Sequence, residues 1–315
     1  MEPDYIQVVR NFFASRKRFL VTSHIHPDGD ATGSLIGLGL ALQAAGKSVQ
    51  MVMTDGAPGS YDFLTGFDQI SRNISGEFDG FITLDCSDIG RLGETFAQIK
   101  PDLNIDHHFT NDNFAVLNWV EPEASATSEI LADHLPAWGL PITQTVAEAL
   151  LMGIVIDTIG FKTSNVSPKT LRLAADLVEL GANLSIIYNK GLEVRSFEAV
   201  RLWGHGIANL HMDGSLIWAN LTLQDRKAAG YPGRDDADLI NLLSTVTRAN
   251  VAVIFVEEND EKVKVSWRAK PGYDVSKIAA AFGGGGHKAA SGAEITGSLE
   301  KVNREVLEAT KMLLK

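Results

Sequence analysis

The first half of the chain alternates short apolar segments with longer helical ones, and this alternation constrains the fold more than any other feature. Strand-like runs and helical patterns follow one another at residues 18–24, 31–47, 48–55, 80–88, 102–108 and 143–158. Parallel strands need long crossover connections, which are usually helices, so this order predicts an α/β fold with a mainly parallel sheet flanked by helices. Ligands of such sheets collect at the carboxyl ends of the strands.

The second half has a different texture, and 315 residues are more than one compact core usually holds. Residues 184–210 are mostly helical in pattern and are predicted to link two domains. Beyond them, strand-like runs at 214–223, 250–260 and 262–270 precede a helical pattern at 274–282 and a glycine run. The third run has the period-2 alternation of a strand. The sequence thus predicts a second, smaller α/β domain.

Charge is distributed unevenly along the chain. Residues 1–190 hold 23 acidic and 12 basic side chains, a net charge of −11, whereas residues 191–315 hold 16 of each. An acidic half repels phosphate groups unless bound cations reverse the local field. The charge count alone does not separate this interpretation from a simpler one, in which the acidic excess only keeps the protein soluble. Neither half has the broad basic patch of a protein that binds long duplexes.

Three features of the sequence indicate the cellular compartment of the protein. No apolar run approaches the roughly 20 residues that span a bilayer. The first 18 residues begin acidic and are typical of an amphipathic helix, so we expect no signal peptide. The single cysteine, Cys86, excludes an internal disulfide and is typical of a reducing environment. We therefore expect a cytoplasmic protein without a membrane anchor.

Acidic and imidazole side chains follow several of the apolar runs. In "HIHPDGD", residues 24–30, His24, Asp28 and Asp30 can converge because the intervening proline and glycine allow a sharp turn. Similar side chains follow the other apolar segments at Asp85, Asp106, His107, His108 and Asp157. An aspartate after a strand is often only a helix N-cap. For Asp28 or Asp85 taken singly, the N-cap and the metal ligand are equally good interpretations. The repeated placement at segment ends favours one shared crevice.

The combined set offers carboxylate oxygens and imidazole nitrogens without a thiolate. Such a set favours Mn²⁺ or Mg²⁺ and leaves Fe, Co or Zn open. Five aspartates in one crevice cannot all stay ionised without counter-charge, since like charges raise one another's pKa. Two divalent cations would supply this charge and could clamp a phosphoryl group for in-line attack. The remaining histidines are interpreted as ordinary surface or core residues: His26, His134, His205 and His211.

At these residues the sequence resembles the DHH phosphoesterase superfamily, named for the triplet that stands here at residues 106–108. "HIHPDGDATGS" matches the first motif, Asp85 in "LDCSD" the second and Asp157 in "DTIGFKTSNVSPKT" the fourth. Ile159 departs from the glycine of many relatives but leaves the aspartate in register. The tail "KVSWRAKPGYDVSKIAAAFGGGGHKAASG" is similar to the DHHA1 domain that accompanies this superfamily.

The resemblance implies a domain plan and roles for the metal-binding set. It implies a DHH catalytic domain over residues 1–184, a helical linker over 185–208 and a DHHA1 substrate-binding domain over 209–315. One Mn²⁺ would be held by His24, Asp28 and Asp85. A second Mn²⁺ would be held by Asp30, Asp85, His107 and Asp157. Mg²⁺ or Co²⁺ are the alternative metals for both positions. Asp85 would bridge the two ions. Asp106 would orient a histidine, and His108 would contact the scissile phosphate or protonate the leaving oxygen.

The glycine run "GGGGHKAASG", residues 283–292, is not a Walker A loop, because a histidine precedes its lysine. Its backbone N–H groups could turn toward an anion, and a flexible turn is the alternative. By resemblance, the terminal nucleotide would be gripped by Arg268, Gly284, Gly285, Gly286 and His287, with Ser291 as a further donor. Arg91 would reach substrate near the metals, with a helix surface as its alternative. Trp267 should face the core.

The resemblance implies a metal-dependent, 3′-5′ exoribonuclease-like phosphoesterase that hydrolyses short oligoribonucleotides and 3′-phosphoadenosine 5′-phosphate (pAp) through a metal-activated water. Its partners would be short single-stranded RNA or mono- and dinucleotides, not long duplexes or membranes, and a homodimer stays open. One alternative is hydrolysis of c-di-AMP or pApA, although the sequence lacks the transmembrane and sensory regions of the membrane-bound cyclic-dinucleotide class. The glycine run disfavours an inorganic pyrophosphatase.

Two rivals come from other functional classes. A nucleotide-binding module that has lost catalysis predicts a broken ligand set, whereas each expected position holds Asp or His. A dehydrogenase-like fold needs a G-x-G-x-x-G turn after the first strand, and "HIHPDGD" occupies that place.

Overall fold

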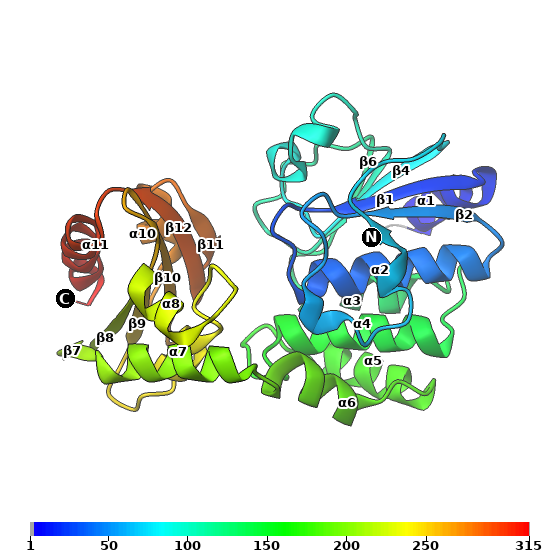
Figure 1. The fold of residues 1–315 in the computed structure, drawn as a ribbon. Coiled ribbons are helices and arrows are strands. Elements are labelled where there is room, and N and C mark those ends of the chain that lie inside the picture. The colour runs from blue at the N-terminus through cyan, green and yellow to red at the C-terminus, as the bar shows by residue number, and fades with distance from the viewer. Residues whose placement is uncertain (1–2, 315) are drawn as a thin grey trace. The chain divides into compact units, whose positions relative to one another are not determined.

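The structure is a computed structural model and describes residues 3–314 (Figure 1). The chain divides into two compact units, of which the first ends at Val194 and the second begins at Arg195. Each unit builds its own six-stranded sheet and its own hydrophobic core. No helix in residues 3–314 is long and apolar enough to cross a membrane.

The first unit contains an all-parallel sheet with the order β3-β2-β1-β4-β5-β6, which confirms the predicted α/β class. Its strands are β1 (Arg18–Ser23), β2 (Ser48–Val52), β3 (Ile70–Ser71), β4 (Gly80–Leu84), β5 (Leu103–Asp106) and β6 (Leu117–Val120). The strand order runs outward from β1 in one direction and from β4 in the other. The crevice at such a switch point, outside the carboxyl ends of the strands, is where open α/β sheets bind ligands.

Helices lie on one side of this sheet, and the last two of them pack on a helix and not on the strands. They are α1 (Pro3–Ser15), α2 (Gly29–Ala44), α3 (Thr127–His134), α4 (Gln144–Asp157), α5 (Pro168–Glu179) and α6 (Leu184–Tyr188). Strand residues such as Phe19 and Val21 join the core beneath the helices, whereas their neighbour Leu20 joins a smaller cluster on the other face. That second face is covered by the 3₁₀ turns η3 (Ile89–Leu92) and η4 (Glu94–Phe96). Two further 3₁₀ turns, η1 (Gly59–Tyr61) and η2 (Phe67–Gln69), follow β2.

The second unit contains a mixed sheet with the order β11-β12-β10-β9-β8-β7, in which only β8 and β9 pair in parallel. Its strands are β7 (His211–Asp213), β8 (Leu216–Leu221), β9 (Val251–Asn259), β10 (Lys262–Ala269), β11 (Gly285–His287) and β12 (Ala290–Thr296). Its helices are α7 (Phe197–Ala208), α8 (Leu223–Ala229), α9 (Leu239–Leu243), α10 (Ser276–Ala281) and α11 (Leu299–Leu313). Residues of α7 and α9 pack on one face, and residues of α10 and α11 pack on the other.

Details of the second half differ from the sequence prediction or refine it. The segment predicted as mostly helical is interrupted: α6 continues into one π-helical turn, η5 (Asn189–Glu193), and α7 begins only at Phe197. The glycine run forms the short strand β11, which pairs with β12 in a hairpin. Gly284 and Gly286 permit this close pairing, because a Cβ atom at either position would collide with a backbone oxygen of β12. Trp267 is fully buried and donates to Oγ1 of Thr310 on α11, as its expected core position requires.

Helices α2 and α4 cross at van der Waals contact through glycine. A Cβ atom at Gly33 would lie 2.6 Å from the carbonyl oxygen of Ala149 and 2.9 Å from the backbone nitrogen of Gly153. A Cβ atom at Gly153 would in turn lie 2.8 Å from Oδ1 of Asp30. The two glycines therefore let α4 approach the first turn of α2, which carries one of the predicted metal ligands.

Substituting Gly33 with alanine should destabilise the first unit by about 2–3 kcal/mol, because the new methyl group meets backbone atoms that cannot move aside. The matched control is Gly59→Ala, where a Cβ atom meets nothing within 4 Å, so stability should change by less than about 0.5 kcal/mol. Denaturant unfolding monitored by circular dichroism measures both variants. Equal unfolding midpoints for the two variants would contradict the close helix crossing.

Candidate metal centre

Acidic and imidazole side chains from separate segments meet at the switch point of the first sheet. His24 follows β1, Asp85 follows β4 and Asp106 ends β5. Asp30 lies in the first turn of α2, and Asp157 is the last residue of α4. The neighbouring positions of β1 and β4 and the close crossing of α2 and α4 bring these groups together from distant parts of the sequence.

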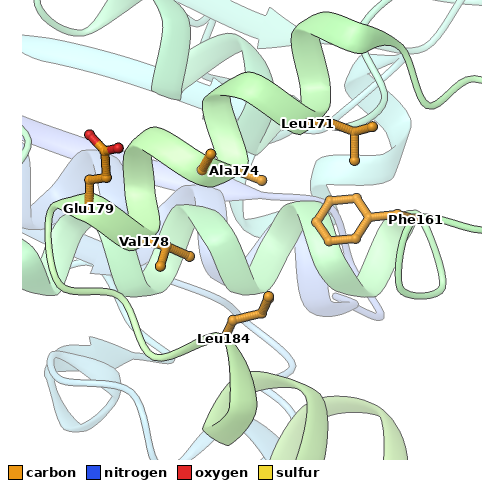
Figure 2. A pocket seen from close by; sticks show the side chains of 7 residues that line it. Phe161, Leu171, Ala174, Val178, Glu179 and Leu184 are labelled. Atoms are coloured by element: carbon orange, nitrogen blue, oxygen red, sulfur yellow. The ribbon is translucent and has the colours of Figure 1, made fainter.

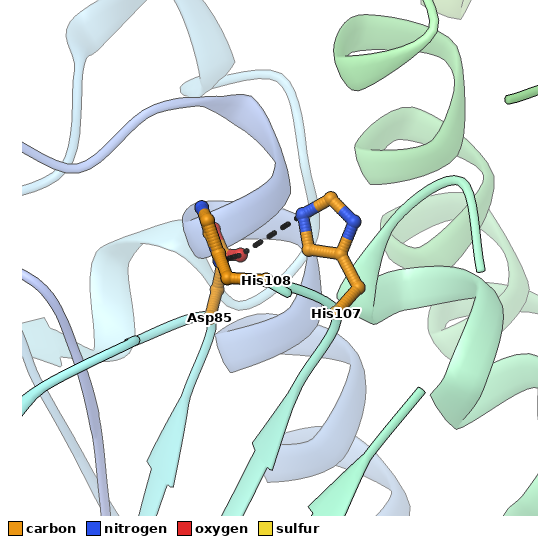
Figure 3. Close-up of side chains that lie close together, drawn as sticks. All are labelled: Asp85, His107 and His108. Carbon is orange, nitrogen blue, oxygen red and sulfur yellow. Dashed lines mark ion pairs between the residues drawn. The ribbon is translucent and has the colours of Figure 1, made fainter. Parts of the chain in front are cut away.

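Three groups of side chains each offer ligand atoms that all lie within 4.8 Å of one another. These groups are His24-Asp28-Asp85, Asp30-His107-Asp157 and Asp85-His107-His108. Asp85 joins two of the groups, and its Oδ2 lies 3.5 Å from Nε2 of His24. Its Oδ1 lies 3.6 Å from Nε2 of His107 and from Nδ1 of His108 (Figure 3). The ligands expected from the sequence thus lie together, with Asp85 in the middle.

Burial and neighbouring imidazoles shift the pKa values of the carboxylates in opposite directions. Burial raises the pKa of Asp30 well above its usual value, and the charges of Asp85 and Asp157 add to the rise. Burial likewise raises the pKa of Asp157 to about 7. Burial also acts to raise the pKa of Asp85, but the hydrogen bond from His24 and the charges of the surrounding imidazoles hold it well below its usual range.

The imidazoles of this cluster respond to the same field. Burial lowers the pKa of His107, but the charges of Asp157, Asp85 and Asp30 outweigh burial and raise it to about 9. Burial also opposes protonation of His24, whose pKa is nevertheless raised by the hydrogen bond to Asp85. In the metal-free protein, protons therefore supply part of the positive charge that the buried carboxylates need.

The first turn of α3 supports two of the aspartates. Backbone N–H groups of Thr127 and Ser128 donate to Asp30 Oδ2 and Oδ1 at 2.6 and 3.0 Å, and Oγ1 of Thr127 donates to Oδ1 of Asp85 at 3.2 Å. A helix N-terminus favours a carboxylate in this position. Sequence reasoning missed this support, although the serine and threonine residues at the start of α3 are typical of a helix N-terminus.

Asp106 is completely buried and contacts the two histidines that follow it. Its Oδ1 lies 2.7 Å from Nδ1 of His108 and accepts the backbone N–H of His107 at 2.9 Å. Nδ2 of Asn111 donates to the other oxygen of Asp106 at 2.5 Å. Asn111 was also missed by the sequence analysis, because its role depends on the turn that folds back after the triplet.

Two residues at or beside the centre have a strained backbone. Asp85 and His26 both adopt positive φ angles, 53° and 55°, which non-glycine residues rarely occupy. The backbone N–H of Asp85 is held by the carbonyl oxygen of Ile105, and that of His26 by Oδ2 of Asp55 at 2.7 Å. Residues kept in such conformations cluster at functional sites, where surrounding structure stabilises them.

The donor set fits a hard or borderline divalent cation. The three groups contain only carboxylate oxygens and imidazole nitrogens, the ligands that suit Mn²⁺, Mg²⁺ and related ions. The neighbouring thiol of Cys86 is buried, and burial raises its pKa to about 12, so it is not a thiolate ligand at neutral pH. Asp28 is the N-cap of α2, where its Oδ1 accepts the N–H of Ala31, and it also belongs to one of the three groups of ligand atoms.

The other histidines and Arg91 have the following places. The side chain of His26 is 80% exposed at the rim of the site. His134 contacts Glu121, His205 contacts Asp225, and His211 stacks on Trp218. Arg91 lies in η3, and its carbonyl oxygen accepts the N–H of Ile25, so it lies beside the loop that carries His24.

The expected substrate-binding residues lie on adjacent strands of the second unit. Arg268 on β10 is directly opposite Ala290 on β12, and Ala290 is directly opposite His287 on β11. The glycines Gly284, Gly285 and Gly286 precede this histidine and lie in or beside β11. Oγ of Ser291 donates to the carbonyl oxygen of His287 at 2.7 Å, so its proton is used within the hairpin.

A separate hollow of about 430 Å³ lies on the first unit (Figure 2). Its lining is mainly apolar and comes from α5, the loop after α4 and the start of α6: Phe161, Leu171, Ala174, Ala175, Val178, Glu179 and Leu184. None of these residues belongs to the three groups of ligand atoms. The hollow therefore is not the candidate metal centre.

Comparison with known proteins identifies the family of the chain. Residues 18–154 match the N-terminal domain of the DHH family, and residues 227–315 match the DHHA1 domain. The bifunctional oligoribonuclease and PAP phosphatase NrnA of Thermus thermophilus is 33% identical over 300 residues, which cover 92% of this chain and 88% of that protein. The chain therefore belongs to the DHH phosphoesterase family and carries a DHHA1 domain.

Two further relatives extend over most of the chain. NrnA of Bacillus subtilis is 28% identical and is matched over 86% of this chain and 87% of its own length. A crystal structure of an exopolyphosphatase-related protein from Bacteroides fragilis superposes with a TM-score of 0.90 at 25% identity, covering 99% of this chain and 98% of that one.

Mn²⁺ affinity should rise with pH between 6 and 9. His107, with a pKa of about 9, and Asp157, with a pKa of about 7, hold protons below these values, and a metal must displace them. Isothermal titration calorimetry in two buffers of different ionisation enthalpy measures the affinity and the protons released. His26→Gln is the control and should keep the same pH dependence. An affinity independent of pH would contradict the proton-loaded cluster.

Proposed function

We propose that the protein hydrolyses short oligoribonucleotides and also removes the 3′-phosphate of pAp, using two divalent cations, with Mn²⁺ as the preferred metal. The observation that carries the proposal is the triple set of ligand atoms around Asp85 at the sheet switch point. The relatives named as oligoribonucleases and PAP phosphatases, matched over most of the chain, support the substrate class.

The residues of the centre would form two metal-binding sites that share one aspartate. His24, Asp28 and Asp85 would hold one ion, and Asp30, His107 and Asp157, with Asp85 shared, would hold the other. When bound, two such ions supply positive charge for the phosphoryl oxygens and lower the pKa of an attacking water. The first turn of α3 fixes Asp30 and Asp85, so the carboxylates keep their positions before substrate arrives.

His108 is the candidate general acid. Asp106 holds its Nδ1 at 2.7 Å, which fixes the ring and directs Nε2 as the atom that delivers a proton to the leaving oxygen. A carboxylate that orients a histidine also stabilises the protonated imidazole. Asn111 holds the other oxygen of Asp106 and keeps that carboxylate in place.

The second unit would bind the part of the substrate that does not react. Arg268 suits a phosphate contact because the guanidinium group offers paired N–H donors. His287 and the preceding glycines would contact the terminal nucleotide from the adjacent strand. We infer substrates of one to a few nucleotides.

We also infer a cytoplasmic location, because a single buried thiol is typical of a reducing compartment.

The deciding experiment is an assay of the purified full-length chain with Mn²⁺ on pAp, pApA, c-di-AMP, a 5′-labelled RNA 3-mer and a 24-mer. The proposal predicts turnover of pAp and of the 3-mer, and slow or no turnover of the 24-mer and c-di-AMP. Preferred turnover of c-di-AMP or pApA would favour the dinucleotide phosphodiesterase alternative. Nucleotide binding without any turnover would identify a binding module that has lost catalysis.

Asp85→Ala should lower kcat for the RNA 3-mer by more than about 100-fold. Changes outside the ligand set already cost 10–100-fold at metal sites, and this substitution removes a ligand shared by both groups. Asp112→Ala, which removes an exposed carboxylate from the nearby loop, is the matched control and should retain activity. Wild-type rates for Asp85→Ala at saturating Mn²⁺ would overturn the shared-ligand role.

Arg268→Ala should raise KM for pAp by about 10–100-fold while metal content stays at the wild-type level. A charged hydrogen-bond pair contributes roughly 1.5–3 kcal/mol, which corresponds to this range. Arg304→Ala, on the exposed side of α11, serves as the control for loss of one positive charge. An unchanged KM for Arg268→Ala would move nucleotide binding to another surface.

A further inference from the structure

The guanidinium group of Arg268 is held from one side by α9. Its Nε donates to Oδ1 of Asn241 at 3.1 Å, and its Nη1 donates to the carbonyl oxygen of Trp267 at 3.1 Å. Asn241 lies in the middle of α9, and its backbone N–H is bonded to the carbonyl oxygen of Asp238. Nη2 of Arg268 donates no hydrogen bond to any residue between 3 and 314. The side chain is thus fixed through two of its nitrogen atoms, while the third keeps its donors for another group.

Electrostatics reinforce this placement. Burial lowers the pKa of Arg268, and the charges of Asp236 and Asp238 act against that change. Asp236 is only 9% exposed, and its Oδ2 accepts the N–H of Ile240 at 3.1 Å. Burial raises the pKa of Asp236, whereas the charge of Arg268 lowers it. The loop before α9 therefore supplies the counter-charge of the arginine without occupying its Nη2.

The same loop is held in a strained conformation. Ala237 and Asp238 both have positive φ angles, 49° and 65°, although neither is a glycine. Nε1 of Trp203 donates to the carbonyl oxygen of Ala237 at 2.9 Å, and Nη2 of Arg195 donates to Oδ2 of Asp238 at 2.9 Å. Two consecutive residues in this region cost free energy, and the contacts from α7 and Arg195 stabilise them. The result is a short helix placed where Asn241 reaches the arginine.

Arg268 projects on the same side of the sheet as the histidine of the glycine run. Residues directly opposite in antiparallel strands project on the same face of a sheet, so Arg268, Ala290 and His287 share one face. Neighbouring strands lie about 4.8 Å apart, which places Arg268 and His287 about 10 Å apart at their Cα atoms. At this register position the strand between them carries the small side chain of Ala290. This spacing suits one phosphate or ribose group.

We propose that Asn241 is a positioning residue, which holds Nε of Arg268 so that the Nη2 edge of the guanidinium meets the anionic end of a nucleotide. The proposal rests on the proposed function, because it specifies how the second unit recognises the nucleotide. Without Oδ1 of Asn241 the arginine would keep its charge but lose its fixed orientation, and binding would weaken without loss of the fold.

A double-mutant cycle tests this role. Asn241→Ala should raise KM for pAp by about three- to tenfold, the effect of one hydrogen bond to a charged group, with kcat nearly unchanged. Asn241→Asp retains an oxygen acceptor and should keep KM within about threefold of wild type. In an Arg268→Ala background, Asn241→Ala should have no further effect, since the two residues act as one unit.

The matched control is Asn303→Ala on α11, which loses a 2.7 Å hydrogen bond to Asn220 and should leave KM unchanged. Thermal unfolding of each variant verifies the fold. An equal increase in KM from Asn241→Ala in the wild-type and Arg268→Ala backgrounds would overturn the proposal, as would an unchanged KM. Because a purely structural defect would add in both backgrounds, the cycle separates positioning from general destabilisation.

Calorimetric titration of pAp into the same full-length variants separates this inference from the proposed function. If the wild-type protein binds pAp without hydrolysing it, the proposed function fails and the cycle is completed with Kd in place of KM. If the wild-type protein neither binds nor hydrolyses pAp, both the inference and the proposed function are wrong.

Discussion

The structure depends most on how negative charge is accommodated at one edge of a parallel sheet. Asp30 and Asp85 are almost completely buried within reach of Asp157, and the ion pairs of Asp85 and Asp157 are formed with imidazoles. Burial raises the pKa of Asp157 and the carboxylate charges raise the pKa of His107, so the metal-free site retains protons on these two residues. Divalent cations would replace those protons and provide stronger compensation, which ties metal binding to the stability of the site.

The fold brings this charge together by ordinary means. The strand order changes direction between β1 and β4, so the loops after these strands diverge and leave a crevice. The glycine contact between α2 and α4 brings Asp157 to the first turn of α2, where Asp30 lies. The N-terminus of α3 then donates to Asp30 and Asp85. Each of these elements is an ordinary feature of α/β folds, and the chemistry comes from the side chains at their ends.

Much of this arrangement could be predicted from the sequence, because its main signals are local. Asp85 follows an apolar run, and "HIHPDGD" joins the end of a strand to the start of a helix, so their placement at the sheet edge follows from the parallel fold. Supporting residues could not be predicted in the same way. Thr127, Asn111 and Asn241 act through contacts with Asp85, Asp106 and Arg268, which lie 42, 5 and 27 residues away in the sequence. These contacts depend on tertiary packing or on an irregular turn, so no local residue pattern predicts them.

The most direct test of the account is a crystal structure of the full-length protein grown with Mn²⁺, with anomalous diffraction measured at the manganese edge. The account predicts two anomalous peaks about 3.5–4 Å apart, one near His24 and Asp28 and one near His107 and Asp157, with Asp85 contacting both. A single peak, or peaks remote from Asp85, would contradict the central claim.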